Sequence, residues 1–113
     1  MSQHYLVFLS IFDIQDHEID FVESQIHSTV IVNSIGENRT STKLDALFHT
    51  ECYLSYKESI ESLTQQLTQT IWDTLYRYVK IEVETILLNP SPAVFRYDEV
   101  DYNAYTGEFP EDD

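Results

Sequence analysis

The clearest element in this sequence, and the strongest constraint on its fold, lies between residues 55 and 78. Ser55-Tyr56-Lys57-Glu58 matches a capping box, in which a serine and a glutamate three residues apart begin a helix. The spacing that follows predicts one amphipathic helix of about six turns, roughly 33 Å long. Its apolar positions recur every three or four residues, at Ile60, Leu63, Leu67, Ile71, Leu75 and Tyr78. Its outer face is polar without charge, with Thr64, Gln65, Thr68 and Gln69.

Four other segments have the composition or alternation of strands. Residues 4–14 are apolar on both faces, which predicts a central, buried strand. Residues 28–35 predict a strand that ends at a turn over Gly36-Glu37-Asn38, followed by an alternating strand over 43–54 and a hairpin between the two. Residues 78–88 alternate again and stop at Asn89-Pro90-Ser91-Pro92, because proline cannot donate to a strand ladder.

The segment 15–27 decides between two α+β folds. Ile19, Val22 and Ile26 have helical spacing, with Asp16 as a possible N-cap, whereas Ile19 and Phe21 also alternate as in a strand. A helix would give the order β-α-β-β-α-β of a ferredoxin-like split βαβ domain, and a strand would give a β-meander with one long helix. In both cases we expect a single domain over residues 1–89, followed by an acidic, aromatic tail over 90–113.

The charge of the chain is strongly negative. Twenty acidic residues face six basic ones, for a net charge of -14. Residues 1–36 carry five acids and no base, and residues 82–113 carry nine acids and only Arg96. A chain of this charge repels nucleic acid and anionic membranes and is attracted to basic protein surfaces. The composition therefore predicts a basic protein partner, with no direct binding of nucleic acid or membrane and with a homodimer as a further possibility.

Cysteine usage and hydrophobic runs bear on the compartment. Cys52 is the single cysteine, so no disulfide can form within the chain, which is typical of a reducing compartment. The apolar run from Tyr5 to Phe12 is too short for a membrane span and has no basic residue before it, unlike a signal peptide. We expect a cytoplasmic protein, in the host cytoplasm if the source is viral.

Signals for catalysis are weak, and we expect neither an enzyme nor a cofactor. The four histidines are scattered without zinc spacing, and the acidic segment from Asp13 to Asp20 lacks the glycine and terminal glutamate of a calcium loop. Cys52 lies on the apolar side of its strand, as an inert core thiol does. Glu82 and Glu84 share one strand face about 7 Å apart, a separation that would suit paired carboxylates.

One short stretch indicates a different hypothesis about function. The run from Tyr5 to Asp13 resembles the first strand of small ferredoxin-like CRISPR spacer-acquisition nucleases, which ends in an aspartate. The resemblance covers nine residues and implies that Asp13 would be the metal-binding acid of a metal-dependent nuclease. That family continues with a basic helix, whereas this chain continues with Asp16, Glu18, Asp20 and Glu23.

The predicted tail interleaves carboxylates with aromatic rings. In an extended chain, residues two apart lie about 7 Å apart, close to the phosphate spacing of a single strand. We therefore expect an acidic nucleic-acid mimic that binds and inhibits a basic nucleic-acid-processing protein, as phage defence inhibitors, immunity proteins and antitoxins do; the alternative is a structural or assembly subunit of a virion or multiprotein complex. The predicted partner-binding residues are Tyr97, Asp98, Glu99, Asp101, Tyr102, Tyr105, Glu108 and Phe109, with Glu82 and Glu84.

Overall fold

The computed structural model describes residues 2–55, 58–87 and 93–107. These residues form an α+β domain with a five-stranded antiparallel sheet and three helices. The elements in chain order are β1 (Ser2–Ile11), α1 (Asp16–Ile26), β2 (Ile31–Arg39), β3 (Leu44–Ser55), α2 (Ile60–Leu75), β4 (Ile81–Leu87), β5 (Ala93–Tyr97) and α3 (Glu99–Thr106).

The predicted α+β class is confirmed, and residues 16–26 are helical, so the meander alternative is wrong. The strands lie in the order β2-β3-β1-β4-β5, and each neighbouring pair is antiparallel. The central position predicted for β1 is confirmed, because Leu9 lies opposite Phe48 of β3 and Val83 of β4. The sheet differs from the predicted four-stranded arrangement because β5 adds a fifth strand beside β4.

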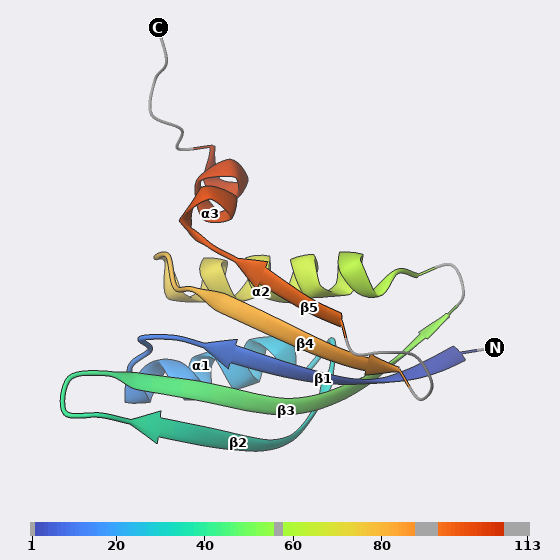
Figure 1. The fold of residues 1–113 in the computed structure, drawn as a ribbon, viewed down its shortest axis with the longest axis horizontal. Coiled ribbons are helices and arrows are strands. Elements are labelled where there is room, and N and C mark those ends of the chain that lie inside the picture. The colour runs from blue at the N-terminus through green and yellow to red at the C-terminus, as the bar shows by residue number, and fades with distance from the viewer. Residues whose placement is uncertain (1, 56–57, 88–92, 108–113) are drawn as a thin grey trace, which may run out of the picture.

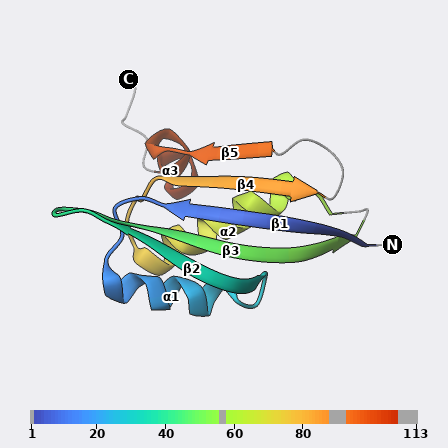
Figure 2. The same ribbon diagram turned by 60° about the horizontal axis from the view of Figure 1, so that its bottom comes forward.

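Among the described residues, helices cover one face of the sheet. Helices α1 and α2 lie side by side behind the strands in Figure 1, and Figure 2 shows the same two layers from below. The core lies between these layers, where alternate strand residues such as Val7, Phe48 and Val83 meet the apolar stripes of the helices and are fully buried. On the opposite face, which no described element covers, Leu6 and Val94 remain exposed.

Helix α2 is shorter than predicted. Ser55 is the last residue of β3, and Ser59 is the N-cap of α2, where its hydroxyl accepts a hydrogen bond from the Ser62 N–H at 2.9 Å. Glu58 is used locally, since its carboxylate accepts from the Ser55 N–H at 2.9 Å. The 16-residue helix is therefore about 24 Å long at the standard rise, and no helix in the described part of the chain is long and apolar enough to cross a membrane.

The structure corrects two further predictions, the turn at Gly36 and the exposure of two threonines on α2. Gly36 is inside β2, opposite Leu47, and the hairpin turn comes later, where the Thr40 N–H donates to the Lys43 carbonyl. Thr64 and Thr68, expected on the outer face of the long helix, are fully buried. The prediction failed at these two threonines because the fifth strand and the last helix were not expected to pack beside this helix.

Part of the segment predicted as an acidic tail over 90–113 is attached to the sheet in the described structure. Strand β5 pairs with β4, with Phe95 opposite Val83, and α3 packs against the C-terminal end of α2 (Figure 1). Residues 93–106 thus belong to the domain rather than to an appendage. Glu108 and Phe109 lie outside the described residues.

Candidate protein-interaction surfaces

The tyrosines predicted to meet a partner pack around Trp72 of α2. The Trp72 ring centroid lies 5.2 Å from that of Tyr102, 6.2 Å from that of Tyr105 and 6.5 Å from that of Tyr97. The indole is itself fixed, because its N–H donates to the Val79 carbonyl at 2.9 Å. Aromatic contacts of this kind stabilise a structure beyond simple area burial. The rings therefore hold β5 and α3 on α2, which explains why an acidic segment contains them.

Two of these tyrosines also form hydrogen bonds to α2. The Tyr97 hydroxyl lies 2.5 Å from the Thr64 hydroxyl, and burial raises the pKa of Tyr97 although this bond opposes the shift. The Tyr105 hydroxyl donates to the Asp73 carboxylate at 2.7 Å, and this bond raises the pKa of Tyr105. Both contacts favour the docked position of the C-terminal elements.

The carboxylates at the start of α3 form a reciprocal cap. The Asp98 side chain accepts from the N–H groups of Val100 and Asp101, and the Asp101 side chain accepts from the Asp98 N–H at 3.0 Å. The hydrogen bond from the Asp101 N–H, with the other backbone donors, lowers the pKa of Asp98. Glu99 is exposed in the first helical turn. Because these residues are helical, the extended 7 Å spacing expected for a phosphate mimic does not apply to them.

Glu82 and Glu84 share a strand face, as predicted, but they lie on the uncovered side of the sheet. They border a hollow of about 480 Å³, which also includes Phe8, His49 and Arg96. Glu82 has two basic neighbours at 3.6 Å, Lys80 and Arg96. Helix α3 packs against α2 on the other side, so the structure separates Glu82 and Glu84 from the acidic residues of α3.

The three helices carry acidic residues and no lysine or arginine. Their sequences contain four carboxylates in α1, two in α2 and two in α3. Two of these eight pair with a base from a neighbouring element: Asp16 with Arg39, and Glu18 with Arg77. The other six have no salt bridge within the described residues, and we call them the acidic helix surface: Asp20, Glu23, Glu61, Asp73, Glu99 and Asp101.

The Glu18–Arg77 pair is partly buried and connects two segments that are far apart in the chain. Arg77 donates to both Glu18 oxygens and to the Asp13 carbonyl. Burial raises the pKa of Glu18, but the hydrogen bonds from Arg77 and from the Gln15 N–H outweigh it, so the pKa lies below its usual value. The pair ties the end of β1 and the start of α1 to the segment after α2.

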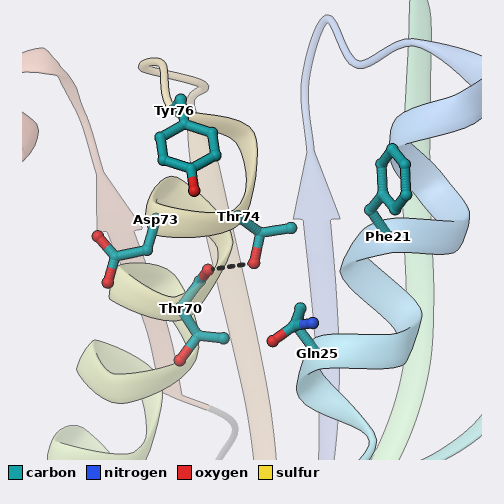
Figure 3. A pocket seen from close by; sticks show the side chains of 6 residues that line it. All are labelled: Phe21, Gln25, Thr70, Asp73, Thr74 and Tyr76. Carbon is teal, nitrogen blue, oxygen red and sulfur yellow. Dashed lines mark hydrogen bonds between the residues drawn. The ribbon is translucent and has the colours of Figure 1, made fainter.

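A groove between α1 and α2 was not predicted from the sequence. Six residues line it, with a volume of about 540 Å³, and we call it the interhelical groove: Phe21, Gln25, Thr70, Asp73, Thr74 and Tyr76 (Figure 3). Phe21 and Tyr76 are 57% and 91% exposed. Tyr76 follows α2 in the left-handed region, at φ 57°. The sequence feature that could have indicated this groove is a tyrosine directly after the last apolar residue of the helix, a position where glycine is more usual.

Asp13, which the nuclease resemblance would make a metal ligand, lies in a turn after β1. It has a positive φ of 61°, and its N–H donates to the Asp45 carboxylate at 2.9 Å. Within residues 2–55, 58–87 and 93–107, no group of three or more His, Cys, Asp or Glu is arranged to hold a metal ion.

Comparison with known proteins gives no functional assignment. No protein-family model matches the chain, and no curated protein matches it. Among solved structures, an uncharacterized protein from Thermotoga maritima is similar at a TM-score of 0.45 and 10% identity, over 79% of this chain and 100% of that one.

Proposed function

We propose that this protein binds a basic surface on a nucleic-acid-processing protein and blocks it. The observation that carries the proposal is the acidic helix surface, which has six carboxylates on three helices that contain no lysine or arginine. A basic surface that attracts phosphate also attracts carboxylates, and complementary charge accelerates association. The class of inhibitor is the one to which phage defence inhibitors, immunity proteins and antitoxins belong.

The mode of inhibition is better described as a charge plug than as an extended mimic of a single strand. The proposed contact surface consists of helices, and the tyrosines that would have stacked like bases are occupied by Trp72. The protein would compete with nucleic acid by occupying the basic surface of the partner, and its carboxylates would not need to match the spacing of phosphates along a strand.

A second candidate is an assembly subunit, and the uncovered sheet face favours it. Leu6, Ile31, Tyr53 and Val94 leave large apolar groups exposed there. Exposed apolar patches of this kind are typical of protein contacts. Light scattering at increasing concentration tests this candidate, because an assembly subunit would form dimers or larger species.

We also infer that the first six elements are a ferredoxin-like unit extended by β5 and α3. Support comes from the antiparallel pairing of β1 with both β3 and β4, and from the position of β3 between β1 and β2. The extension matters for the proposal, since α3 brings Glu99 and Asp101 to the side of the sheet on which α1 and α2 lie.

The function can be tested with two matched double variants that each remove two negative charges. Asp20→Asn/Glu23→Gln changes the acidic helix surface, and Glu82→Gln/Glu84→Gln changes the uncovered sheet face. Basic proteins captured from the native host would be purified, and their binding to each variant measured over a range of salt. We expect the helix variant to bind more weakly and with a smaller salt dependence, whereas the sheet variant keeps the wild-type affinity.

A displacement assay then measures inhibition directly, with labelled DNA or RNA bound to the purified partner. The wild-type protein should release the nucleic acid at low salt, and the helix variant should need a higher concentration. The proposal fails if no purified nucleic-acid-binding protein is bound at low salt, or if the two double variants displace nucleic acid equally well.

A further inference from the structure

The interhelical groove contains two largely exposed aromatic side chains, of which Phe21 makes one edge contact, with His17 at 6.2 Å between ring centroids. Phe21 on α1 and Tyr76 after α2 flank the space between the helices (Figure 3). Tyr76 is 91% exposed, so its ring gains little from burial. Large exposed rings on two sides of a hollow are typical of a site that receives another group.

The backbone at Tyr76 is strained as well. Its φ of 57° lies in the left-handed region, where a side chain with a Cβ is disfavoured and where glycine commonly ends a helix. Glycine at this position would raise the folding equilibrium constant by about fivefold. A strained residue with an exposed ring points to a role in binding rather than in folding.

The polar groups in the groove are mainly hydrogen-bond acceptors. The Thr70 hydroxyl donates to the Gln66 carbonyl at 2.8 Å, and the Thr74 hydroxyl donates to the Thr70 carbonyl at 2.7 Å. Since each hydroxyl has used its proton, each can only accept from a ligand. Asp73 accepts from Tyr105 through Oδ2, and Oδ1 has no hydrogen bond from the described residues. The groove therefore favours a ligand that donates several hydrogen bonds.

The residues that line the groove include one carboxylate, Asp73, and no lysine or arginine, which favours a cationic ligand. Helices α1 and α2 contain six carboxylates and no lysine or arginine, and only Asp16 and Glu18 of these pair with a base in the described structure. A guanidinium group is planar, always charged and carries five N–H donors, and it stacks on aromatic faces more readily than an ammonium. The groove volume of about 540 Å³ is in the usual range for a ligand site.

We propose that the interhelical groove receives an arginine side chain of the basic partner, stacked against Phe21 and Tyr76 and paired with Asp73. This inference rests on the proposed function and names the anchor point within it. The acidic helix surface would attract the partner, and the groove would fix its position, since aromatic and charged contacts at one pocket commonly dominate an interface.

A short fluorescent Gly/Ser peptide containing arginine provides a defined probe, with matched peptides in which lysine or citrulline replaces arginine. Fluorescence anisotropy at low salt should give the tightest binding for arginine, weaker binding for lysine and the weakest for neutral citrulline. Phe21→Ala and Tyr76→Gly should each weaken arginine binding on the order of tenfold. Tyr53→Ala, which removes an exposed ring from the sheet face, is the matched control and should leave binding unchanged.

The Tyr76→Gly variant separates a binding role from a structural one, because it should melt at a higher temperature while binding arginine less tightly. The inference is overturned if Tyr76→Gly binds the arginine peptide like the wild type, if citrulline binds as well as arginine, or if the wild type binds no peptide. Loss of binding in Asp20→Asn/Glu23→Gln with full binding in Tyr76→Gly would refute the groove while leaving the proposed function intact. Equal displacement of nucleic acid by the two double variants would refute the proposed function itself.

Discussion

The replacement Glu18→Gln would measure what the pair between α1 and the segment after α2 contributes to stability. Glutamine keeps the size of the side chain and an oxygen that can accept from the Gln15 N–H, a bond of 3.0 Å in this structure. It removes the charge that faces Arg77, whose guanidinium donates to both Glu18 oxygens. The Glu18 side chain is 10% exposed and that of Arg77 is 36% exposed.

The exposure sets the magnitude. Hydrogen bonds to charged groups contribute about 1.5–3 kcal/mol, and loss of one partner from a fully buried pair costs about 3–5 kcal/mol. Because water reaches Arg77 after the change, we expect a value at the lower end of these ranges. Glu18→Gln should lower the free energy of unfolding by about 1.5 kcal/mol at pH 7. Asp20→Asn is the control on the same helix, because Asp20 is exposed and has no salt bridge in the described structure, and it should cost less than about 0.5 kcal/mol.

The pH dependence gives the sharper test. The pKa of Glu18 is lower in the folded protein than its ordinary value, so its contribution is complete above the ordinary pKa and is lost as the pH falls through the folded pKa. Urea unfolding of wild type and Glu18→Gln at pH 7 and in acid should therefore give a difference that shrinks in acid. A difference that stays constant between these pH values would refute the role assigned to the Glu18 charge.

Three further predictions concern packing, two of them beside α2 and one at Cys52 of β3. Tyr102→Ala should cost about 2 kcal/mol and raise amide hydrogen exchange in α3, because its ring packs on Trp72, whereas Val100→Ala at a 69% exposed position should not. Thr68→Val should be neutral or stabilising by up to about 1 kcal/mol, because the buried Thr68 hydroxyl has no partner in the described structure. Thr64→Val should destabilise the protein, because it removes hydrogen bonds to Tyr97 and to a backbone carbonyl. Chemical denaturation of both variants measures this order of stability, and the opposite order would show that the Thr68 hydroxyl has a partner. Burial, with the charge of Glu58, raises the pKa of the Cys52 thiol to about 11, so iodoacetamide at pH 8 should label Cys52 only on unfolding, and rapid labelling of the native protein would contradict its burial.

Local periodicity was sufficient to predict four strands and the long helix within the first 89 residues, but it left residues 15–27 open between helix and strand. The alternation over 43–54 placed Phe48, Cys52 and Leu54 on the buried face, where they lie in the structure. The repeat of apolar residues likewise identified α2 correctly from Leu63 to Leu75. These predictions succeed because a helix or strand with one buried face imposes its own spacing on the sequence.

The ends of the elements were less well predicted because several residues compete for the same local role. Ser55 and Ser59 can both begin a helix, and the pairing of β3 with β1 up to Ser55 leaves the cap to Ser59. Gly36 resembles a turn residue, yet its opposite neighbour Leu47 continues the strand pair past it. In each case, a hydrogen bond to a distant strand decided the boundary.

The amino-acid sequence by itself determined the α+β class and the acidic character of the chain. Only the tertiary structure decided that β5 joins the sheet, that Tyr97, Tyr102 and Tyr105 pack on Trp72, and that Phe21 and Tyr76 border one groove. The physical reason is that charge and periodicity are properties of neighbouring residues. The partner of an aromatic ring or of an edge strand is instead chosen by contacts between segments that are far apart in the chain.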